Sequence, residues 1–319
     1  MELSSSKTIE DEILNNYVDY QHLFINFQSK FLSSLYSRYQ SLESGKIVLH
    51  FARETHQDIL RQKDYDLNFN ISYENFWENH SKTKPRQRSL IKIAEDILLP
   101  KETIRRKILL LIKQKVLSKK NKNIAWLPNE QYKQNYSSFI NEEVNDVSKL
   151  IIFICEKNKI KISREVLTEE LKKKFSFFWF HYLGAQIEYL KLWNKQLNDL
   201  ELVFITLQVA SLFTKKAKEK GLSHSNIYNN PALIKNFISA SVGATSISEV
   251  TGIPRATCLR KLETLVKNKI ISKDKNSKRY YLIPNSISED LISLESTKGV
   301  VKIFSNFFFI CLRAMNVKT

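Results

Sequence analysis

The two halves of the chain resemble each other along much of their length. Residues 91–119 align with residues 245–273 without a gap, at an offset of 154, and 11 of these 29 pairs are identical. Weaker matches continue at an offset of 155 upstream and 156 downstream. Similarity at a fixed spacing indicates a repeated structural unit. We therefore predict an internal duplication, with one copy over residues 1–157 and a second copy over residues 158–319.

Each copy is predicted to be mainly α-helical. The 319 residues include only 6 Gly and 6 Pro, which leaves few residues for the tight turns of a sheet-rich fold. Apolar residues at three-and-four spacing predict pairs of long helices. These pairs fall at 12–42 with 46–63, and at 174–196 with 199–219. Breaks are expected at Ser44-Gly45 and Asn198-Asp199, and closing helices at 130–157 and 286–313.

Residues 246–268 have the pattern of a helix-turn-helix. Gly252 can end a first helix in a left-handed conformation, and Pro254 suits the first turn of the next helix. Ile247, Ile253 and Leu262 fall where two crossing helices bury apolar groups. A strand, a basic turn at 274–278 and a returning strand follow directly. Residues 91–122 repeat the pattern, but Leu98 replaces the turn glycine, so we expect a looser corner or a different backbone there.

The run Ile253-Pro254-Arg255-Ala256-Thr257, with Arg260-Lys261-Leu262-Glu263 and the strands after it, resembles winged-helix bacterial transcription regulators. The flanking long helices make each copy similar to one subunit of the multiple-antibiotic-resistance (MarR-like) class. The resemblance is most specific over residues 229–284 and moderate over 72–128. It implies two tandem winged helix-turn-helix units with small β-wings, which form a pseudo-dimer that binds double-stranded DNA in the cytoplasm, at the nucleoid.

The resemblance places one recognition helix of each copy in a major groove, where an Arg side chain can read guanine. The expected base-contacting residues are Lys101, Thr103, Arg105, Arg106, Arg255, Thr257 and Arg260. The expected phosphate-contacting residues are Lys107 and Lys261 on the helices and Lys119, Lys120, Lys122, Lys273, Lys275, Lys278 and Arg279 on the wings. Because the two helices differ, the DNA site should have two unlike halves.

The distribution of charge favours the same segments. The chain has 50 Lys and Arg against 33 Asp and Glu, a formal net charge of +17. Residues 82–122 contain 14 basic and 3 acidic residues, and residues 255–279 contain 9 and 2. The two windows therefore account for the whole surplus. A basic surplus concentrated on a motif is typical of a surface that binds a polyanion.

Other classes of function lack a motif. No phosphate-binding loop, nucleophile elbow or Cys/His ligand cluster occurs, so we expect neither an enzyme nor a cofactor or metal. The three Cys have no CxxC spacing, and core packing is favoured for each. No membrane segment is expected, and RNA polymerase or another regulator would be a secondary partner. Two alternatives stay open: a plasmid-type replication initiator with two winged helices, and a winged-helix scaffold for protein docking.

Overall fold

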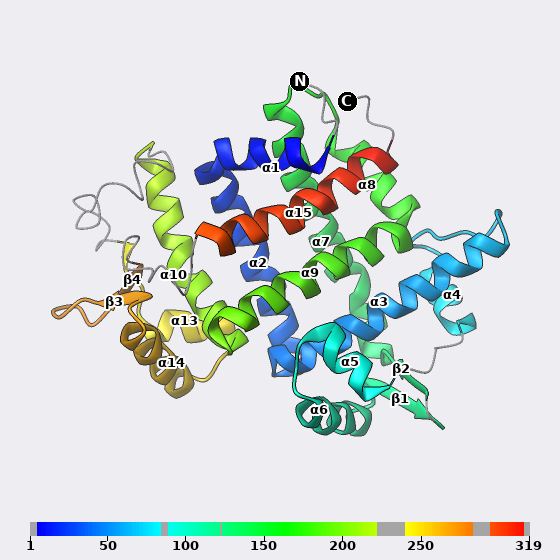
Figure 1. The fold of residues 1–319 in the computed structure, drawn as a ribbon, viewed down its shortest axis with the longest axis horizontal. Helices are drawn as coiled ribbons and strands as arrows, with labels where there is room; N and C mark the ends of the chain where they lie inside the picture. Colours follow the sequence, from blue (N-terminus) through cyan, green and yellow to red (C-terminus); the bar gives the residue numbers. More distant parts are fainter. Residues whose placement is uncertain (1–4, 84–88, 122, 222–239, 283–293, 316–319) are drawn as a thin grey trace. The chain divides into compact units, whose positions relative to one another are not determined.

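The computed structural model describes residues 5–83, 89–121, 123–221, 240–282 and 294–315. Within these residues the protein is mainly helical, with 13 helices and two antiparallel sheets of two short strands each (Figure 1). The prediction of a mainly α protein is confirmed. Lys122, residues 229–239 and 283–284 of the second predicted motif, and residues 286–293 of the second closing helix lie outside the described residues.

The first half of the chain contains seven helices and one sheet among its described residues. In chain order these elements are α1 (Ser6–Asn15), α2 (Tyr17–Tyr39), α3 (Leu42–Tyr65), α4 (Phe76–Lys82), α5 (Leu90–Ile97), α6 (Lys101–Lys113), β1 (Leu117–Lys120), β2 (Asn123–Trp126) and α7 (Glu130–Lys157).

The second half follows nearly the same order. Its described elements are α8 (Arg164–Lys173), α9 (Phe175–Leu197), α10 (Leu200–Glu219), α13 (Ala244–Thr251), α14 (Arg255–Lys267), β3 (Ile271–Lys273), β4 (Tyr280–Leu282) and α15 (Leu294–Ala314).

The left-handed residues of the backbone also recur at matching places. Most residues other than glycine avoid positive φ because the Cβ atom crowds the backbone there. Four such places in the first half have counterparts in the second: the link between the first two long helices, the turn before the basic helix, the turn after it, and the tip of the small sheet. The pairs are Gln40 and Asn198, Leu98 and Gly252, Lys115 and Lys269, and Asn121 and Lys278.

The element bounds correct the predicted register of the long helices. Helices α2 and α9 both have 23 residues and begin at residues 17 and 175, while α3 and α10 begin at residues 42 and 200. The offset is therefore 158 here, and not the 155 predicted from apolar spacing. Residues three positions apart lie on the same helix face, so apolar periodicity cannot separate these two registers.

The breaks between the long helices are predicted only in part. The helix predicted at 12–42 is two helices, because Asn16 ends α1 and precedes α2. The break predicted at Ser44-Gly45 is wrong, since both residues lie in the first turns of α3. The chain turns instead at Gln40, whose φ is 51° and whose N–H bonds to the Tyr36 carbonyl. The break at Asn198-Asp199 is confirmed, with the Asp199 side chain capping α10.

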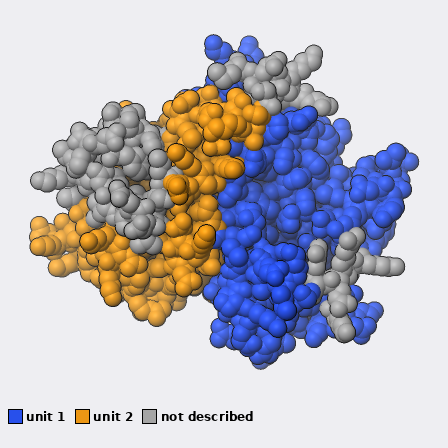
Figure 2. Space-filling view, viewed as in Figure 1, with its two compact units in different colours: residues 1–4, 43–191, 303–319 blue, residues 5–42, 192–302 orange. Residues whose placement is uncertain are grey.

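The chain divides into two compact units, and each unit combines segments from both halves of the sequence (Figure 2). Unit 1 consists of residues 1–4, 43–191 and 303–319, and unit 2 of residues 5–42 and 192–302. The boundary therefore falls within the long helices α9 and α15. The two predicted copies rest on sequence similarity and remain a prediction, whereas the units are defined by packing.

An aromatic cluster forms the centre of unit 1. Phe76 is fully buried, and its ring stacks on that of Tyr136 at 5.5 Å and meets the edge of Phe175 at 5.5 Å. His56 stacks on the same Phe76 ring at 4.8 Å, and burial lowers the pKa of this histidine to about 3. Such rings remove much apolar surface from water. The aromatic residues at the start of α9 therefore serve packing inside the protein.

Unit 2 is built on the pairing of α2 with α10. These helices pack closely along their lengths, and α13 and α14 lie against them. Ser33 of α2 donates a hydrogen bond to the Val250 carbonyl at 3.2 Å, which ties α2 to the end of α13. The sheet edge is extended by Val242, whose backbone pairs with Tyr280 of β4. Unit 2 thus holds α13, α14 and the second sheet on a two-helix support.

Candidate nucleic-acid interface

Helices α5 and α6 pack against each other in unit 1 and are joined by a short turn at residues 98–100. The Ser89 side chain accepts a hydrogen bond from the Lys92 N–H and begins α5, and Pro100 immediately precedes α6. Ile93, Ile104 and Leu111 are completely buried between the helices. Apolar residues at this spacing hold one face of each helix against the other. The opposite face of α6 is left for solvent.

The corner between α5 and α6 is built on the same kind of backbone as its counterpart. Leu98 has φ 48° and ψ 59°, while Gly252 has φ 73° and ψ 1°, so both ends are left-handed. The expectation of a different backbone at Leu98 is therefore wrong, while that of a looser corner stays a prediction. Packing of buried neighbours such as Ile97 and Leu99 holds the turn, although a leucine in this region carries a steric cost.

In unit 2 the corner between α13 and α14 is held by side-chain hydrogen bonds. Ser248 Oγ donates to the Ile253 carbonyl at 2.7 Å, and Thr251 Oγ1 accepts from the Ile253 N–H at 3.2 Å. Cys258 Sγ lies 3.4 Å from the same carbonyl. The first half has the apolar residues Ala94, Ile97 and Ile104 at these positions. The two corners therefore both have a left-handed turn, but side-chain hydrogen bonds hold the second corner and apolar packing holds the first.

The outer face of α6 presents uncompensated positive charge. Lys101 and Arg106 are exposed, and among the described residues neither has a carboxylate within 4 Å. Arg105 is also exposed, but its guanidinium lies 2.6 Å from Glu102 in the same helix. Thr103 is half-buried. Of the residues predicted to read bases in the first half, Lys101 and Arg106 are therefore the most available.

The outer face of α14 shows the same pattern. Arg260 is exposed at the position equivalent to Arg106, again with no carboxylate within 4 Å among the described residues. Arg255 is exposed, and its Nε donates to Thr245 at 3.1 Å. Thr257 is half-buried. The matching arginines of the two helices thus face outward in both units.

Lys107 and Lys261 do not share this outward face, although we expected them to meet phosphates. The Lys107 ammonium lies 3.0 Å from Glu43 of α3, with 15% of its side chain exposed. The Lys261 ammonium lies 2.5 Å from Asp199 and 3.0 Å from Glu201 of α10, with 11% exposed. Burial alone would lower the pKa of Lys261, but the bonds to these two carboxylates raise it. Both lysines join the basic helix to its supporting long helix.

Sequence periodicity contained a signal for this inward orientation. Lys107 stands three residues after the buried Ile104 and four before the buried Leu111, and so belongs to the buried face of α6. Glu43 and Glu201 each occupy the second position of their helix, where a carboxylate is favoured by the helix dipole. The acidic partners lie too far away in the sequence for that spacing to reveal them.

Some basic residues of the two small sheets are exposed to solvent, and others bind a partner within the protein. Lys119 and Lys120 on β1 are exposed, as are Lys275 and Lys278 in the turn between β3 and β4. Lys273 instead lies 2.7 Å from Glu263, which also accepts a bond from the Tyr280 hydroxyl at 2.9 Å. Most of the described basic residues that were predicted to form the wings are therefore exposed.

Arg279 has a structural partner in the part of the chain that the structure describes. Its guanidinium donates two hydrogen bonds to the Ser241 carbonyl, at 2.8 and 3.1 Å. These bonds attach the second sheet to the chain before α13. The sequence predicted no contacts for Glu263, Tyr280 or Ser241. Their role depends on contacts between distant residues, which a motif does not show.

Two exposed leucines interrupt the outer face of α6. Leu109 and Leu110 are 51% and 47% exposed, and follow directly after the basic stretch of the helix. The equivalent residues of α14 are Glu263 and Thr264. Glu263 supports the second sheet, so the two outer faces differ in chemistry beyond the shared arginine.

The cysteines occupy core positions, as expected. Cys155, Cys258 and Cys311 are buried and make no disulfide. Burial raises the pKa of each thiol, in the case of Cys155 to about 11, so none favours the reactive thiolate form. Within the described ranges, no three His, Cys, Asp or Glu side chains are grouped so as to hold a metal ion.

Among the described residues, no single helix is both long and apolar enough to cross a bilayer. Helices α9 and α10 are long and apolar enough only when taken together, as a pair bent by 97°.

Each unit therefore presents an outer helix face with an exposed arginine at the same position, and a small sheet with exposed lysines. The chain matches no protein-family model, and no characterised protein or solved structure was found to be significantly similar to it.

Proposed function

We propose that the protein is a DNA-binding transcription regulator. The two helix-turn-helix arrangements with their small sheets would act as tandem winged helices on one site in double-stranded DNA. The observation that carries this proposal is the equivalence of Arg106 and Arg260, which are both exposed and both without a carboxylate within 4 Å among the described residues. An arginine on the outer face of such a helix can donate two hydrogen bonds to guanine.

Phosphate contacts would come from the exposed lysines beside these helices. Lys119 and Lys120 in unit 1 and Lys275 and Lys278 in unit 2 lie on the small sheets or their turns. Contacts of this kind supply affinity and strong salt dependence, but no choice of sequence. Lys107 and Lys261 are not part of the proposed interface, because they bind carboxylates of the supporting helices.

The DNA site would have two related but unlike halves. Arg106 and Arg260 predict a guanine at the equivalent place in each half. The neighbouring positions differ, because Lys101 corresponds to Arg255, and Arg105 to Leu259. Arg105 is also partly neutralised by Glu102, whereas the Leu259 position carries no charge. Selection should therefore yield an imperfect rather than a symmetric palindrome.

A selection from random double-stranded DNA, followed by fluorescence anisotropy with the full chain, tests the proposal. Arg106→Ala and Arg260→Ala should each relax the preference at one guanine, with a loss of about 1–3 kcal/mol in discrimination. Arg164→Ala is the matched control, because Arg164 is an exposed arginine on α8, outside both motifs. Absence of any enriched sequence, or equal effects of all three variants, would contradict the proposal.

One observation favours a second function for the first motif. Leu109 and Leu110 expose apolar surface on the face of α6 that would approach DNA. Exposed apolar residues on one face are typical of protein-binding sites. The first motif would then dock another protein while the second binds DNA. In that case Leu109→Glu would weaken capture of the partner, and Arg106→Ala would leave DNA specificity unchanged.

A further inference from the structure

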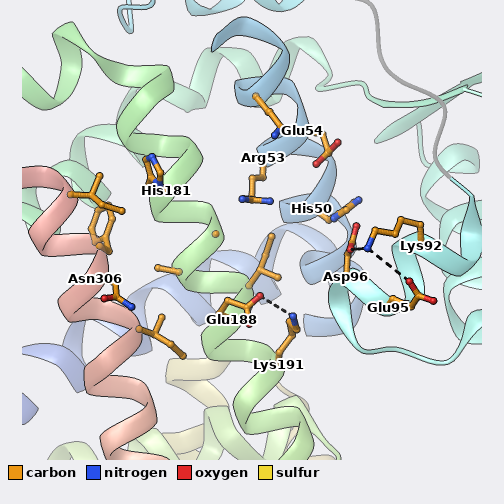
Figure 3. Close-up of a pocket in the computed structure, with 17 residues that line it drawn as sticks. His50, Arg53, Glu54, Lys92, Glu95, Asp96, His181, Glu188, Lys191 and Asn306 are labelled. Atoms are coloured by element: carbon orange, nitrogen blue, oxygen red, sulfur yellow. Dashed lines mark hydrogen bonds and ion pairs between the residues drawn. The ribbon is translucent and has the colours of Figure 1, made fainter. Parts of the chain in front are cut away.

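A cleft in unit 1 is lined by none of the residues on the outer face of α6. It has a volume of about 590 Å³ and is lined by α3, α5, α9 and α15 (Figure 3). Cavities of about 300–1,000 Å³ are typical of small-molecule sites. Figure 3 shows Arg53 of α3 and His181 of α9 facing the same space, with Asn306 coming from α15. All of its lining residues belong to unit 1.

The equivalent helix pair in unit 2, α2 and α10, is bridged by polar side chains. Helices α2 and α10 are joined by hydrogen bonds at two successive levels. Gln208 Nε2 donates to Ser29 Oγ at 2.9 Å, and Ser211 Oγ donates to Asn26 Oδ1 at 3.1 Å. Polar side chains thus connect α2 and α10 directly where the two helices cross.

In unit 1 the same positions are occupied differently. At the offset of 158, Ser211 corresponds to Arg53 and Asn26 to Gly184. A Cβ atom on Gly184 would lie 3.1 Å from Arg53 Nε, closer than most side-chain contacts, so glycine makes room for this arginine. Helices α3 and α9 also approach each other less closely than α2 and α10 do. The crossing of α2 and α10 in unit 2 is therefore bridged by side-chain hydrogen bonds, while the equivalent crossing in unit 1 borders a cleft.

Arg53 is held in a fixed place at the wall of the cleft. Its Nε donates to the Phe180 carbonyl at 3.3 Å, and its guanidinium carbon lies 4.2 Å from the centre of the Phe180 ring. Stacking of this kind orients a guanidinium. His181 lies beside it, and burial together with the charge of Arg53 lowers the pKa of His181. A neutral imidazole and a cation therefore stand side by side.

The lining contains charges of both signs. Three basic and four acidic side chains face the cleft. Several pair with each other: Lys92 lies 2.9 Å from Asp96, and Lys191 lies 2.8 Å from Glu188. A simple anion would meet the carboxylates, and a simple cation would meet Arg53. A ligand that carries both charges fits this lining better than either.

One wall of the cleft is apolar. Helix α15 contributes Ile303, Phe307 and Ile310, and Ile187 of α9 adds to them. Apolar walls with a few placed polar groups give a pocket both affinity and orientation. The ligand should therefore have an apolar side chain as well as its two charged ends.

We propose that this cleft binds a small amphipathic zwitterion, an amino acid or short peptide with an apolar side chain. Arg53 binds its carboxylate, the acidic groups at α5 and α9 bind its ammonium group, and the α15 wall receives its side chain. The cleft is a binding site and not a site of chemistry. No bond is formed or broken in it.

The position of the cleft suggests what binding would do. Helix α5 lines it through Lys92, Glu95 and Asp96, and the same helix leads through Leu98 into α6. A ligand that differs in affinity for two positions of α5 shifts the balance between them. This regulatory part rests on the proposed DNA binding, because it predicts a change in DNA affinity when the cleft is filled.

Isothermal titration calorimetry with the full chain tests the site without DNA. The probes are L-phenylalanine and the dipeptide Leu-Phe, compared with N-acetyl-Leu-Phe, which lacks the ammonium group, and Leu-Phe amide, which lacks the carboxylate. We expect L-phenylalanine, Leu-Phe or both to bind. If Leu-Phe binds, each blocked dipeptide should bind at least tenfold more weakly than Leu-Phe does. No binding by either zwitterion, or equal binding by the blocked forms, would overturn the proposal.

Two variants locate the binding in the cleft. Arg53→Gln should weaken binding at least tenfold, and Gly184→Leu should abolish it by filling the space against Arg53. Asn26→Ala is the matched control at the repeat-equivalent position in unit 2, and should leave binding unchanged. Circular dichroism and thermal melts establish that each variant is folded. If Asn26→Ala reduces binding as much as Arg53→Gln, the site is not this cleft.

The two proposals can fail separately. Binding of a zwitterion with no binding of DNA would overturn the proposed function and leave the cleft as a ligand site. DNA binding without zwitterion binding would do the reverse. If both are observed, anisotropy with and without ligand tests the regulatory part, and an unchanged DNA affinity at saturating ligand would overturn it.

Discussion

The Lys107 ammonium group lies 3.0 Å from the Glu43 carboxylate, and this ion pair has a counterpart in the other half of the protein. There Lys261 lies 3.0 Å from Glu201, and Asp199 adds a second carboxylate. In both cases the lysine is the seventh residue of the basic helix, and the glutamate is the second residue of the long helix. The two halves thus share a contact that joins the proposed reading helix to its supporting helix.

Removing the buried ammonium group of Lys261 should destabilise the protein more than removing its exposed neighbour Arg260. Lys261→Met would leave Asp199 and Glu201 close together without a cation. Because both carboxylates keep some contact with water, we expect a loss of about 1–3 kcal/mol in the free energy of unfolding. Urea denaturation measures this difference. Equal stability of Lys261→Met and Arg260→Met would show that the ion pair contributes nothing to the fold.

The left-handed Leu98 should be improved by glycine. Leu98 has φ 48° and is 47% exposed, so Leu98→Gly relieves steric strain at little cost in burial. The expected gain is about 1 kcal/mol in the free energy of unfolding, reduced by the greater entropy of glycine in the unfolded chain. The reverse change, Gly252→Leu, should destabilise unit 2, because Gly252 has φ 73°. A decrease in the thermal midpoint for Leu98→Gly would contradict this account.

Lys46 should make stability depend on pH in the alkaline range. This lysine is fully buried in α3, and its ammonium group has no hydrogen-bond partner in the part of the chain that the structure describes. Burial, together with the nearby charge of Lys191, lowers its pKa from 10.5 to about 8. Between pH 8 and 10.5 Lys46 is mostly protonated in the unfolded chain and mostly neutral in the folded protein. The unfolded state then binds more protons, so the free energy of unfolding rises with pH over this range.

The comparison with Lys46→Met isolates that effect from other titrating groups. The second half has Phe204, also fully buried, at the equivalent position, so an apolar side chain suits this site. Lys46→Met should be more stable than the wild type at pH 7, by about 2–3 kcal/mol. The advantage should shrink as pH rises above 8. A constant difference across this range would mean that Lys46 is not the group that titrates.

The exposed lysines of the second sheet should control the salt dependence of DNA binding. Each phosphate contact contributes about 0.9 to the slope of log affinity against log salt concentration. Lys275→Gln with Lys278→Gln should therefore lower the slope by about 1.8, without changing the preferred sequence. Anisotropy titrations at several salt concentrations measure it. Lys7→Gln in α1 is a suitable control, and an equal change in both proteins would argue against the proposed contacts.

Several local features of the fold could be predicted from the sequence. Gly252 and Pro254 indicated the turn between α13 and α14, and the closing helix at 130–157 matches α7. These features depend on neighbouring residues, whose conformational preferences act over one or two turns. The alignment of the α2 sequence with that of α9 could not be predicted in the same way, because a shift of about one helical turn keeps the apolar residues on the same face.

The partners of individual side chains were not available from local pattern. Lys107 and Lys261 belong to basic segments that indicate a binding face, yet Glu43 and Glu201, some 60 residues away, turn both of them inward. The cleft around Arg53 was missed for a similar reason. Its lining comes from four helices spread over most of the chain, and its most informative residue, Gly184, acts by lacking a side chain.

Residue types and short spacings are sufficient to predict a mainly helical chain, two similar halves, and the places where positive charge is concentrated. Contacts between distant residues in the folded protein determine which cations remain exposed, which segments of the chain share a core, and where a cleft opens. Burial and ion pairing depend on residues that are distant in the chain and close in space, so Arg106 and Lys107, neighbours in one basic stretch, acquire opposite roles.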